Sequence, residues 1–342
     1  MPFDALLLVS FGGPEKREEV IPFLENVLRG KNVPRERMLA VAEHYYHFGG
    51  KSPINDQNRE LIASIQKDFA ANNIQLPIYW GNRNWHPMLA GTLRRMKNDG
   101  VKNALAFFTS AFSSYSGCRQ YRENIAAAQQ EVGDGAPQIS KLRAFYNHPN
   151  FIQAMADRIQ KTLQELPNKL RNGAQVLYTA HSIPLNMAQS SKYVEQLEEA
   201  CALVSAALGR SGDRLVYQSR SGPPTQPWLE PDVLDYLREA KQKNVPAVVL
   251  APIGFISDHM EVLYDLDTEA KNLCEEMQLP MARAATAGTH PLFVRMIREL
   301  VTERMDPGIP RRALGKYGPN HDICPENCCL PGTMRPPVTR AP

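Results

Sequence analysis

The segment 251–269 reads APIGFISDHMEVLYDLDTE and directly follows the apolar run Ala247–Leu250. The run predicts a buried β-strand, and the segment beyond its carboxyl end predicts a helix. On that helix three carboxylates recur every four residues and stack along one face, namely Glu261, Asp265 and Glu269. The core-facing side is expected to hold Leu263, Leu266, Ala270 and Leu273. This strand-to-helix unit is typical of a parallel α/β sheet.

The acidic face of this predicted helix has two interpretations. Like charges four residues apart repel by a few tenths of a kcal/mol per pair, which a solvated surface tolerates. Alternatively, the carboxylates line a ligand site, because open α/β sheets bind ligands in the crevice beyond the carboxyl ends of their strands. A row of oxygen ligands at that place suits a divalent cation. The position at a strand end favours the second interpretation.

Apolar runs alternate with amphipathic stretches along most of the chain, which predicts parallel sheets covered by helices on both faces. The runs expected as strands are 5–9, 78–80, 104–108, 176–178, 214–217, 247–250 and 281–284, and the segment 142–145 ends the first half. We expect two doubly wound α/β domains, residues 1–148 and 149–306, followed by a cysteine-containing tail, 307–342. A single (β/α)₈ barrel is the alternative. The tail is expected to be ordered only if its cysteines hold something.

Composition and termini narrow the class of protein. The chain has 342 residues, of which 43% are hydrophobic and 22% charged, as is ordinary for a globular protein. The net charge of +3 and the lack of a basic block argue against a nucleic-acid partner. The start, MPFDALLLVS, lacks the basic region and cleavage site of a signal peptide. No apolar run approaches the roughly 18 residues of a membrane-spanning helix. We therefore expect a cytoplasmic protein.

Two further strand ends carry candidate functional residues. Ser10–Pro14 follows the first strand but lacks the G-x-G-x-x-G fingerprint, so we expect a tight turn close to a ligand and no dinucleotide site. His181 follows the strand that ends at Ala180, a position equivalent to that of Glu261. Together, His181 and Glu261 could abstract protons and ligate a metal from one cleft. His259 is a competing candidate, two residues before Glu261.

Aromatic and basic residues gather in the predicted loops and could hold a flat, anionic ligand. Rings would pack against its face, and arginines would pair with its carboxylates. The residues are Arg29, His44, Tyr45, Tyr46, Ser52, Arg83, Trp85, Tyr115, Tyr121 and Trp228. Taken singly, each is equally typical of a core or rim position.

Three of the six cysteines lie close together in the tail, as Cys324, Cys328 and Cys329. In a chain without a secretory signal, this group indicates metal binding or redox chemistry rather than a disulfide framework. Four thiolates would hold an iron–sulfur cluster or zinc, so a fourth must come from elsewhere. Cys118 lies in a segment where it could be exposed, whereas Cys201 and Cys274 lie in amphipathic helices, where cysteine is usually a core residue. An unliganded tail is the alternative.

Six motifs, in order along nearly the whole chain, resemble the ferrochelatase family, whose members insert ferrous iron into a porphyrin. They are LLLVSFGGP, HYYHFGGKSPIN, FFTSAFSSYSG, TAHSIP, YQSRSGPPTQPWLEPDV and APIGFISDHMEVLYDLD. More narrowly, the chain is similar to the actinobacterial branch, which acts on coproporphyrin III and often carries a [2Fe–2S] cluster. The resemblance implies two Rossmann-like domains with the active cleft between them. It also implies a lyase of haem biosynthesis with coproporphyrin III and Fe²⁺ as substrates.

The resemblance further implies roles for individual residues. His181 and Glu261 match the catalytic positions and, with Asp265 and Glu269, the metal-binding positions. Substrate contacts map onto Arg29, Tyr46, Ser52 and Tyr121, to which the loop pattern adds Tyr115 and Trp228. Many bacterial relatives have a metal-facing tyrosine at the position of Phe11. Phenylalanine cannot ligate, so that role is lost or moves to another residue, and Phe11 is expected to contact substrate. The cluster would use Cys118, Cys324, Cys328 and Cys329.

Other activities fit the same residues. Protoporphyrin IX could replace coproporphyrin III as substrate, and imidazole and oxygen ligands discriminate weakly between iron, cobalt and nickel. A porphyrin or haem carrier with a redox-sensing cluster is a third alternative, although a carrier needs no row of carboxylates to pass protons. We expect a monomer that makes at most transient contacts with neighbouring haem-pathway enzymes.

Overall fold

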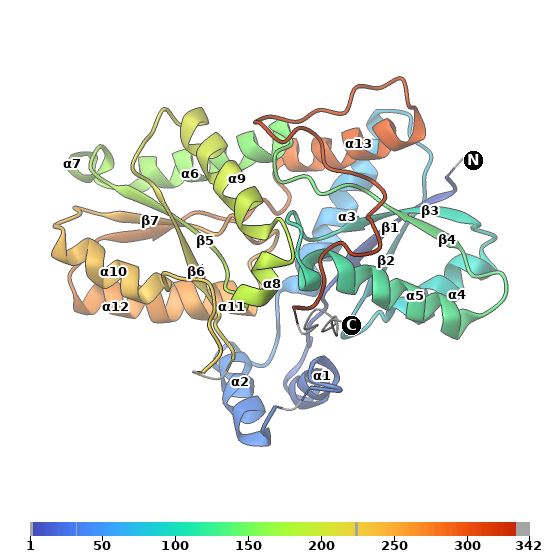
Figure 1. Ribbon diagram of the computed structural model, residues 1–342, viewed down its shortest axis with the longest axis horizontal. Helices are drawn as coiled ribbons and strands as arrows, with labels where there is room; N and C mark the ends of the chain where they lie inside the picture. Colours follow the sequence, from blue (N-terminus) through green and yellow to red (C-terminus); the bar gives the residue numbers. More distant parts are fainter. Residues whose placement is uncertain (1–2, 32, 223–224, 333–342) are drawn as a thin grey trace, which may run out of the picture.

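The computed structural model describes residues 3–31, 33–222 and 225–332 and contains two parallel four-stranded sheets (Figure 1). The first sheet has the order β2-β1-β3-β4, with β1 Ala5–Ser10, β2 Ile78–Asn82, β3 Asn103–Phe108 and β4 Gln138–Lys141. The second has the order β6-β5-β7-β8, with β5 Gln175–His181, β6 Arg214–Gln218, β7 Val248–Ala251 and β8 Met281–Arg283. Because the strands of each sheet are parallel, their carboxyl ends share one edge.

Helices cover both faces of each sheet, as buried parallel strands require (Figure 1). The α-helices are α1 Val20–Val27, α2 Arg35–His47, α3 Ile54–Ala71, α4 Leu89–Asn98, α5 Gln120–Val132, α6 Pro149–Glu165, α7 Asn168–Arg171, α8 Leu185–Gln189, α9 Tyr193–Ala207, α10 Val233–Gln242, α11 Met260–Tyr264, α12 Lys271–Glu276 and α13 Pro291–Met305. Three short segments differ from them: the 3₁₀ turn Arg17–Glu19 and the π-helical segments Tyr115–Arg119 and Asp265–Ala270. Within the described ranges, none of the helices is long and apolar enough to cross a membrane.

The predicted fold of two Rossmann-like α/β units is confirmed. The barrel alternative is wrong, because the described strands form two separate sheets. The two halves nevertheless share buried apolar residues, and the rings of Phe107 and Phe293 lie 6.2 Å apart. Arg298 on α13 also donates from Nε to Asp68 Oδ2 on α3, at 2.8 Å. Because these contacts cross from one half to the other, they do not locate a boundary between domains. The domain boundaries that we placed at residues 148 and 306 stay a prediction.

The strand that closes the first sheet is β4, the largely polar segment Gln138–Lys141, and the segment Leu142–Phe145 that ends the first half follows it as a connection. β4 lies at the edge of the sheet, where polar residues are tolerated because one side of the strand is unpaired. Leu142 and Phe145 of the connection are buried in the core shared by both halves.

Residues 307–332, here called the strap, have no helix or strand and run from α13 between the two halves towards α8 (Figure 1). Side chains outside the strap define its path. Asn147 Nδ2 donates to the carbonyl oxygens of Leu314 and Gly318, at 3.0 and 2.9 Å. Lys141 Nζ donates to the carbonyl oxygen of His321, at 3.1 Å. We expected the tail to be ordered only if its cysteines hold something. These hydrogen bonds to Asn147 and Lys141 also hold the strap in place.

Candidate active site

His181 and Glu261 lie together at the carboxyl edge of the second sheet. His181 is the last residue of β5, and Glu261 is in the first turn of α11, which follows the neighbouring strand β7. His181 Nε2 lies 3.8 Å from Glu261 Oε2, and the side chains are 34% and 50% exposed. The structure thus brings the two predicted residues into one accessible pair, while their chemical roles stay a prediction.

The backbone orients the imidazole ring of His181. Its Nδ1 is within hydrogen-bond distance of the Ser182 carbonyl oxygen, which can only accept, so Nδ1 carries the proton of the neutral ring. Nε2 then keeps its lone pair on the side of Glu261. Tyr193 Oη donates to the His181 carbonyl oxygen at 3.0 Å and holds the strand end in place. A ring in this state can accept a proton or ligate a metal ion at Nε2.

The competing candidate, His259, has a local structural role. Its Nδ1 accepts a hydrogen bond from the backbone N–H of Glu261 at 3.2 Å and so caps the N-terminus of α11. Burial lowers the pKa of His259, against the opposing effect of the Glu261 charge. A neutral His259 is therefore suited to hold the turn that carries Glu261.

The helix after Glu261 is not a uniform α-helix. The π-helical segment Asp265–Ala270 joins α11 to α12. Along α11, the π-helical segment and α12 together, buried residues recur every four positions, as Val262, Leu266, Ala270 and Cys274. The expected core residues Leu263 and Leu273 are only half-buried. On an α-helix of about 3.6 residues per turn, residues four apart shift progressively around the helix axis. The wider π turn offsets this shift, so the buried residues stay on one face of the helix and the acidic residues on another.

Asp265 differs sharply from Glu261 in its surroundings. Burial raises the pKa of Asp265 to about 7, and the charges of Glu261 and Glu269 act in the same direction. Ser219 Oγ and Gln218 Nε2 donate to Asp265 Oδ2, the latter at 3.1 Å, and oppose this shift. Gln218 Nε2 also lies 3.3 Å from the carbonyl oxygen of Glu261. The acidic row therefore contains two exposed carboxylates, Glu261 and Glu269, and between them the half-buried Asp265, whose pKa lies near neutrality.

Gln218 and Ser219 belong to the site but were not among the predicted site residues. Gln218 is the last residue of β6 and pairs in register with His181 at the end of β5. Ser219 has a φ of 62°, in the left-handed region that few non-glycine residues adopt. Such strain is often kept where a side chain must be aimed, and here the Ser219 hydroxyl is aimed at Asp265.

The first half contributes helix α2 to the other side of the site. The ring of His44 stacks on that of Tyr264, with centroids 3.6 Å apart. Burial raises the pKa of Tyr45, and the charge of Glu261 adds to this effect. A further link between the halves joins α3 to the loop before α11, where Gln57 Oε1 accepts a hydrogen bond from the backbone N–H of Asp258 at 2.9 Å. Glu261 is therefore enclosed by residues of both halves.

The predicted substrate residues divide into two groups. Phe11, Tyr115 and Tyr121 gather around Arg83 at the carboxyl edge of the first sheet. The Arg83 guanidinium lies 4.4 Å from the Tyr121 ring centroid and 5.7 Å from that of Phe11. Tyr115 Oη donates to Glu123 Oε2 at 3.0 Å. Phe11 is 37% exposed, whereas Tyr121 is buried, so only part of this group faces solvent.

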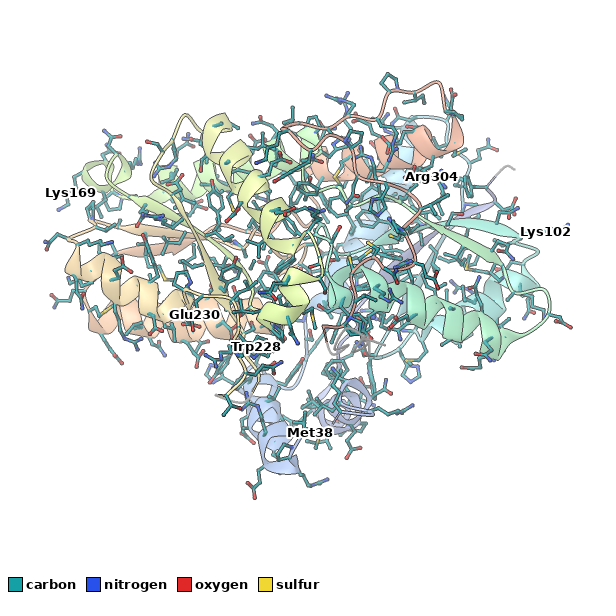
Figure 2. The ribbon with its side chains drawn as sticks, in the orientation of Figure 1. Met38, Lys102, Lys169, Trp228, Glu230 and Arg304 are labelled. Atoms are coloured by element: carbon teal, nitrogen blue, oxygen red, sulfur yellow. The ribbon has the colours of Figure 1, made fainter. Side chains whose placement is uncertain are left out.

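The remaining predicted substrate residues are more dispersed. Arg29 is exposed just beyond α1. Tyr46 on α2 is covered by Arg17, whose guanidinium carbon lies 4.1 Å from the centroid of the Tyr46 ring. Ser52 is buried, and its backbone N–H donates to the Pro14 carbonyl oxygen at 2.8 Å. Trp228 is buried near the carboxyl edge of the second sheet, on the side of α2 (Figure 2). The structure does not bring these four residues into mutual contact.

The four predicted cluster cysteines lie together. Cys118 shares a hydrogen bond with Cys324, which raises the pKa of Cys118 and lowers that of Cys324. The sulfur atoms of Cys328 and Cys329 are 3.4 Å apart. His321, Cys324 and Cys328 offer ligand atoms within 4.8 Å of one another. Cys118 lies in a segment that could have left it exposed, but it is buried, because the strap lies against it.

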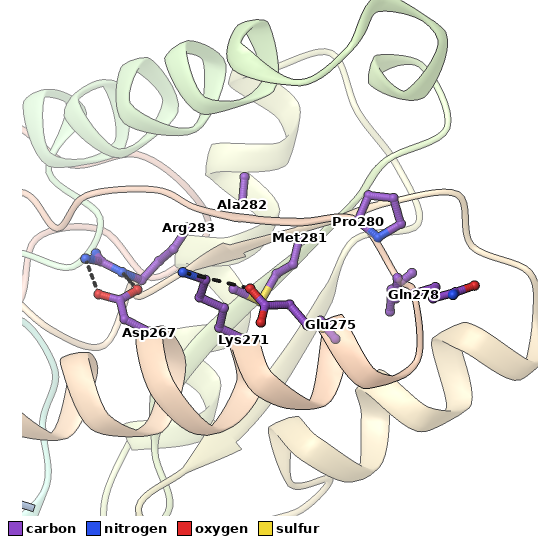
Figure 3. Close-up of a pocket in the computed structure, with 10 residues that line it drawn as sticks. Asp267, Lys271, Glu275, Gln278, Pro280, Met281, Ala282 and Arg283 are labelled. Atoms are coloured by element: carbon purple, nitrogen blue, oxygen red, sulfur yellow. Dashed lines mark hydrogen bonds and ion pairs between the residues drawn. The ribbon is translucent and has the colours of Figure 1, made fainter.

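A cavity of about 630 Å³ lies away from these groups, between α12 and the edge strand β8. Its lining includes two ion pairs, Asp267–Arg283 and Lys271–Glu275 (Figure 3). Neither His181 nor Glu261 lines it. Its charged residues are already paired, so we assign the chemistry to the strand-end site.

A sequence model of the ferrochelatase family matches residues 3–305 of this chain. The chain belongs to the ferrochelatase family. A ferrochelatase from Rhodopirellula baltica is 62% identical over 338 residues, which cover 98% of this chain and 96% of that protein. A coproporphyrin III ferrochelatase from Streptomyces coelicolor is 49% identical over 362 residues, which cover 99% of this chain and 96% of that protein. The prediction of an enzyme of the lyase class in haem biosynthesis is thereby confirmed.

Among solved structures, the ferrochelatase fold of this chain resembles other chelatases. SirB from Bacillus subtilis with Fe³⁺ superposes with a TM-score of 0.52 at 12% identity, over 88% of this chain and 96% of that chain. The sirohydrochlorin chelatase SirB from Bacillus subtilis subspecies spizizenii in complex with cobalt gives a TM-score of 0.52 at 11% identity, over 89% and 96%. At such low identity these structures support the two-unit fold alone.

Proposed function

We propose that this protein inserts Fe²⁺ into coproporphyrin III to give coprohaem and two protons. The observation that carries the proposal is the pair of His181 Nε2 and Glu261 Oε2, which lie 3.8 Å apart. Both side chains are accessible to solvent, and residues of both halves lie around them. Insertion must remove two protons from pyrrole nitrogens and strip water from the metal ion. An imidazole and a carboxylate at one point can accept those protons and ligate the incoming ion. The names of several relatives support coproporphyrin III over protoporphyrin IX.

His181 is the proposed proton acceptor. Its Nδ1 proton is directed to the Ser182 carbonyl oxygen, so the free Nε2 faces the place where the macrocycle nitrogens would lie. Glu261, half-exposed beside it, would stabilise the imidazolium that forms and contact the metal ion. The two groups together supply acid–base chemistry near neutral pH.

Asp265 and Glu269 are the proposed route between this pair and the outside. Burial raises the pKa of both carboxyls, to about 7 for Asp265, so Asp265 is able to take up and release a proton near neutrality. The π-helical segment keeps them in line behind Glu261. Protons would leave, or iron would arrive, along this row.

The proposed porphyrin contacts are the substrate residues predicted from the sequence. Cationic and hydroxyl groups would pair with the carboxylates, and rings would pack against the macrocycle. The residues are Phe11, Arg29, Tyr46, Ser52, Tyr115, Tyr121 and Trp228. Binding energy made along this surface would distort the ring and expose its nitrogen lone pairs. A cytoplasmic monomer, with at most transient contacts to neighbouring enzymes, stays part of this proposal.

Cys118, Cys324, Cys328 and Cys329 are the proposed ligands of a [2Fe–2S] cluster, which would supply a one-electron redox centre. The residues fit this group. The four thiols converge from two distant parts of the chain, and such a set suits thiolate-bound iron. The positive charges of Lys141 and Arg122 face Cys324 and favour its thiolate. Within the described structure, Arg122 Nε is buried without a hydrogen-bond partner, as expected for a donor facing an anionic group.

The catalytic assignment is tested with His181→Ala. We expect this variant to bind coproporphyrin III with the affinity of the wild type but to insert Fe²⁺ at least about 100-fold more slowly, the usual range for a lost general base. Porphyrin binding is followed by fluorescence and insertion by absorbance under anaerobic conditions. Substantial turnover by the variant would contradict the assignment.

The cluster assignment is tested by iron and sulfide analysis of the purified protein together with its visible spectrum. Cys118→Ser is expected to remove the cluster absorption. Cys201→Ser is the matched control, because Cys201 is buried on α9 and lies outside the group. Equal spectra for the two variants would exclude Cys118 as a ligand.

A further inference from the structure

The strap ends on helix α8, close to His181 in the chain. Ser190 Oγ donates to the Leu330 carbonyl oxygen at 2.7 Å, with the Met187 carbonyl oxygen of α8 as a second acceptor at 2.9 Å. Asn186 Nδ2 donates to the Gly332 carbonyl oxygen at 2.6 Å. Gly332 has a φ of +72°, and a Cβ on it would lie 2.8 Å from the backbone nitrogen of Met187. Only glycine permits this close approach of the strap to α8.

The same part of the strap is held to the first half at its cysteines. Arg119 Nη1 donates to the carbonyl oxygens of Glu326 and Cys328, at 2.7 and 3.2 Å. Arg119 directly follows Cys118, which is hydrogen-bonded to Cys324. The short segment 326–332 therefore links the cysteine group on the first half to α8 on the second.

Helix α8 is in turn linked to the ring of His181. Ser182, whose carbonyl oxygen accepts from His181 Nδ1, lies three residues before the first residue of α8, Leu185. Ser182 is also held by its own hydrogen bonds, from its N–H to the Gln218 carbonyl oxygen at 2.8 Å and from its hydroxyl to that of Leu229 at 2.9 Å. Because the connection is short, we expect a shift of α8 to strain these bonds and to displace the Ser182 carbonyl, and with it the His181 ring. A misplaced general base loses rate even when substrate still binds, because proton transfer depends on orientation.

We propose that the strap is a positioning element for His181. By joining α8 to the cysteine group, it keeps the His181–Ser182 connection in the orientation needed for proton acceptance, and filling the four cysteines tightens this link. Ser190 and Asn186 are then positioning residues, since they act on the reaction only through His181. The link to filled cysteines rests on the proposed cluster, whereas the link from strap to His181 does not.

Ser190→Ala tests the proposal, with Ser191→Ala as matched control. Ser191 Oγ donates only within its own segment, to the carbonyl oxygens of Met187 and Ala188, at 3.1 and 3.3 Å. For Ser190→Ala we expect amide hydrogen exchange in residues 182–190 to accelerate about fivefold, the change typical of one lost hydrogen bond. We also expect kcat for iron insertion to fall about fivefold with KM for coproporphyrin III unchanged. Ser191→Ala is expected to leave all three values at those of the wild type.

Equal exchange rates and equal kcat in the two serine variants would overturn the positioning role. Cys328→Ser tests the second link, and we expect it to accelerate exchange in 182–190 as Ser190→Ala does. Unchanged exchange in Cys328→Ser, in protein whose wild type contains iron and sulfide, would overturn the link to filled cysteines. If the wild type contains neither element, the proposed cluster and this second link both fail, while the serine comparison still decides the positioning role.

Discussion

At the scale of single residues, Asp265 shows how its surroundings change a carboxyl group. Burial raises its pKa from an ordinary value of 3.8 to about 7, although Ser219 and Gln218 donate hydrogen bonds to it. The folded protein therefore binds this proton more tightly than the unfolded chain does. The contribution of Asp265 to stability is then fully present below about pH 4 and is lost as the pH rises through 7.

Asp265→Asn removes this titration while an amide oxygen can still accept from Ser219. We expect the variant to be about 4 kcal/mol more stable than the wild type at pH 8, the free energy that corresponds to a pKa raised from 3.8 to about 7, and nearly equally stable near pH 4. Iron insertion is expected to slow, because the asparagine cannot pass a proton. Urea unfolding at both pH values measures the first effect. A variant less stable than the wild type at pH 8 would show that the ionised carboxylate stabilises the fold.

Glu261 is tested by Glu261→Gln against Glu275→Gln. Glu275 is a comparably exposed glutamate on α12, paired with Lys271 at 3.9 Å and absent from the proposed site. We expect the first variant to lose about 100-fold in the rate of iron insertion and the second to keep the wild-type rate. If both variants insert iron equally fast, Glu261 has no role in the chemical step.

The sequence could indicate part of this site because strand ends meet at one edge of a parallel sheet. That argument placed His181 beside Glu261, as the structure shows. It could not find Gln218 or Ser219, whose role depends on strand register and on an unusual backbone angle. It also left the exposure of Cys118 open, since the strap that covers it comes from a distant part of the chain.

At the scale of elements, the π-helical segment Asp265–Ala270 is fixed by more than its own hydrogen bonds. Asp267 accepts from Arg283 Nε and Nη2 at 2.6 and 2.8 Å, a two-point ion pair with the edge strand β8. Arg283 Nη1 also donates to Asp258 Oδ1 at 2.7 Å, just before α11. The arginine thereby ties residues on both sides of α11, which carries Glu261, to the sheet.

Asp267→Asn should weaken this connection. The loss of a partly buried, bidentate ion pair is expected to lower the free energy of unfolding by about 1–3 kcal/mol, since hydrogen bonds to charged groups contribute more than neutral ones. Asp235→Asn is the control, because Asp235 and Arg238 form an exposed pair whose loss should change stability by less than about 1 kcal/mol. Equal losses in thermal or urea unfolding would contradict this role of Arg283.

The spacing of apolar and acidic residues predicted a helix after β7, but it could not predict the π-helical segment within it. Residues spaced four apart also occur on a solvated α-helix, where each is rotated slightly around the axis from the one before. Only the buried set Val262, Leu266, Ala270 and Cys274 reveals that the segment is widened to keep one face towards the sheet.

At the scale of the whole molecule, buried polar groups join the two halves and the strap. Arg143 and Glu303 form an ion pair with exposed fractions of 0% and 2%. Arg143 Nη2 also donates to the Arg312 carbonyl oxygen of the strap at 2.7 Å. Nearby, His148 caps α6 by accepting from the Asn150 backbone N–H at 3.2 Å. Removing one member of such a buried pair is strongly destabilising, which favours a fixed arrangement of the halves.

His148 gives this junction a pH dependence. Burial and the charge of Arg143 lower its pKa from 6.5 to about 3, so the folded protein keeps the ring neutral while the unfolded chain takes up a proton below about pH 6.5. The wild type should therefore lose about 2 kcal/mol from this group between pH 7.5 and pH 5. His148→Asn retains a capping side chain and should lose less over this range. Identical pH dependence of unfolding for both proteins would contradict this account.

Strand and helix alternation was sufficient to predict two parallel units, because short apolar runs alternate with amphipathic stretches along most of the chain. It was not sufficient to predict how closely they join. The packing of α13 on α3, the shared phenylalanine cluster and the path of the strap depend on contacts between residues that are far apart in the sequence. No local pattern marks such contacts.

The central claim is that this protein inserts ferrous iron into coproporphyrin III. The most direct test mixes the protein with coproporphyrin III and Fe²⁺ under anaerobic conditions and follows the porphyrin absorption spectrum. We predict that the free-base bands are replaced by those of the iron complex far faster than without protein, and faster than with protoporphyrin IX. A rate equal to the background, with porphyrin bound to the protein, would identify a carrier and contradict the account.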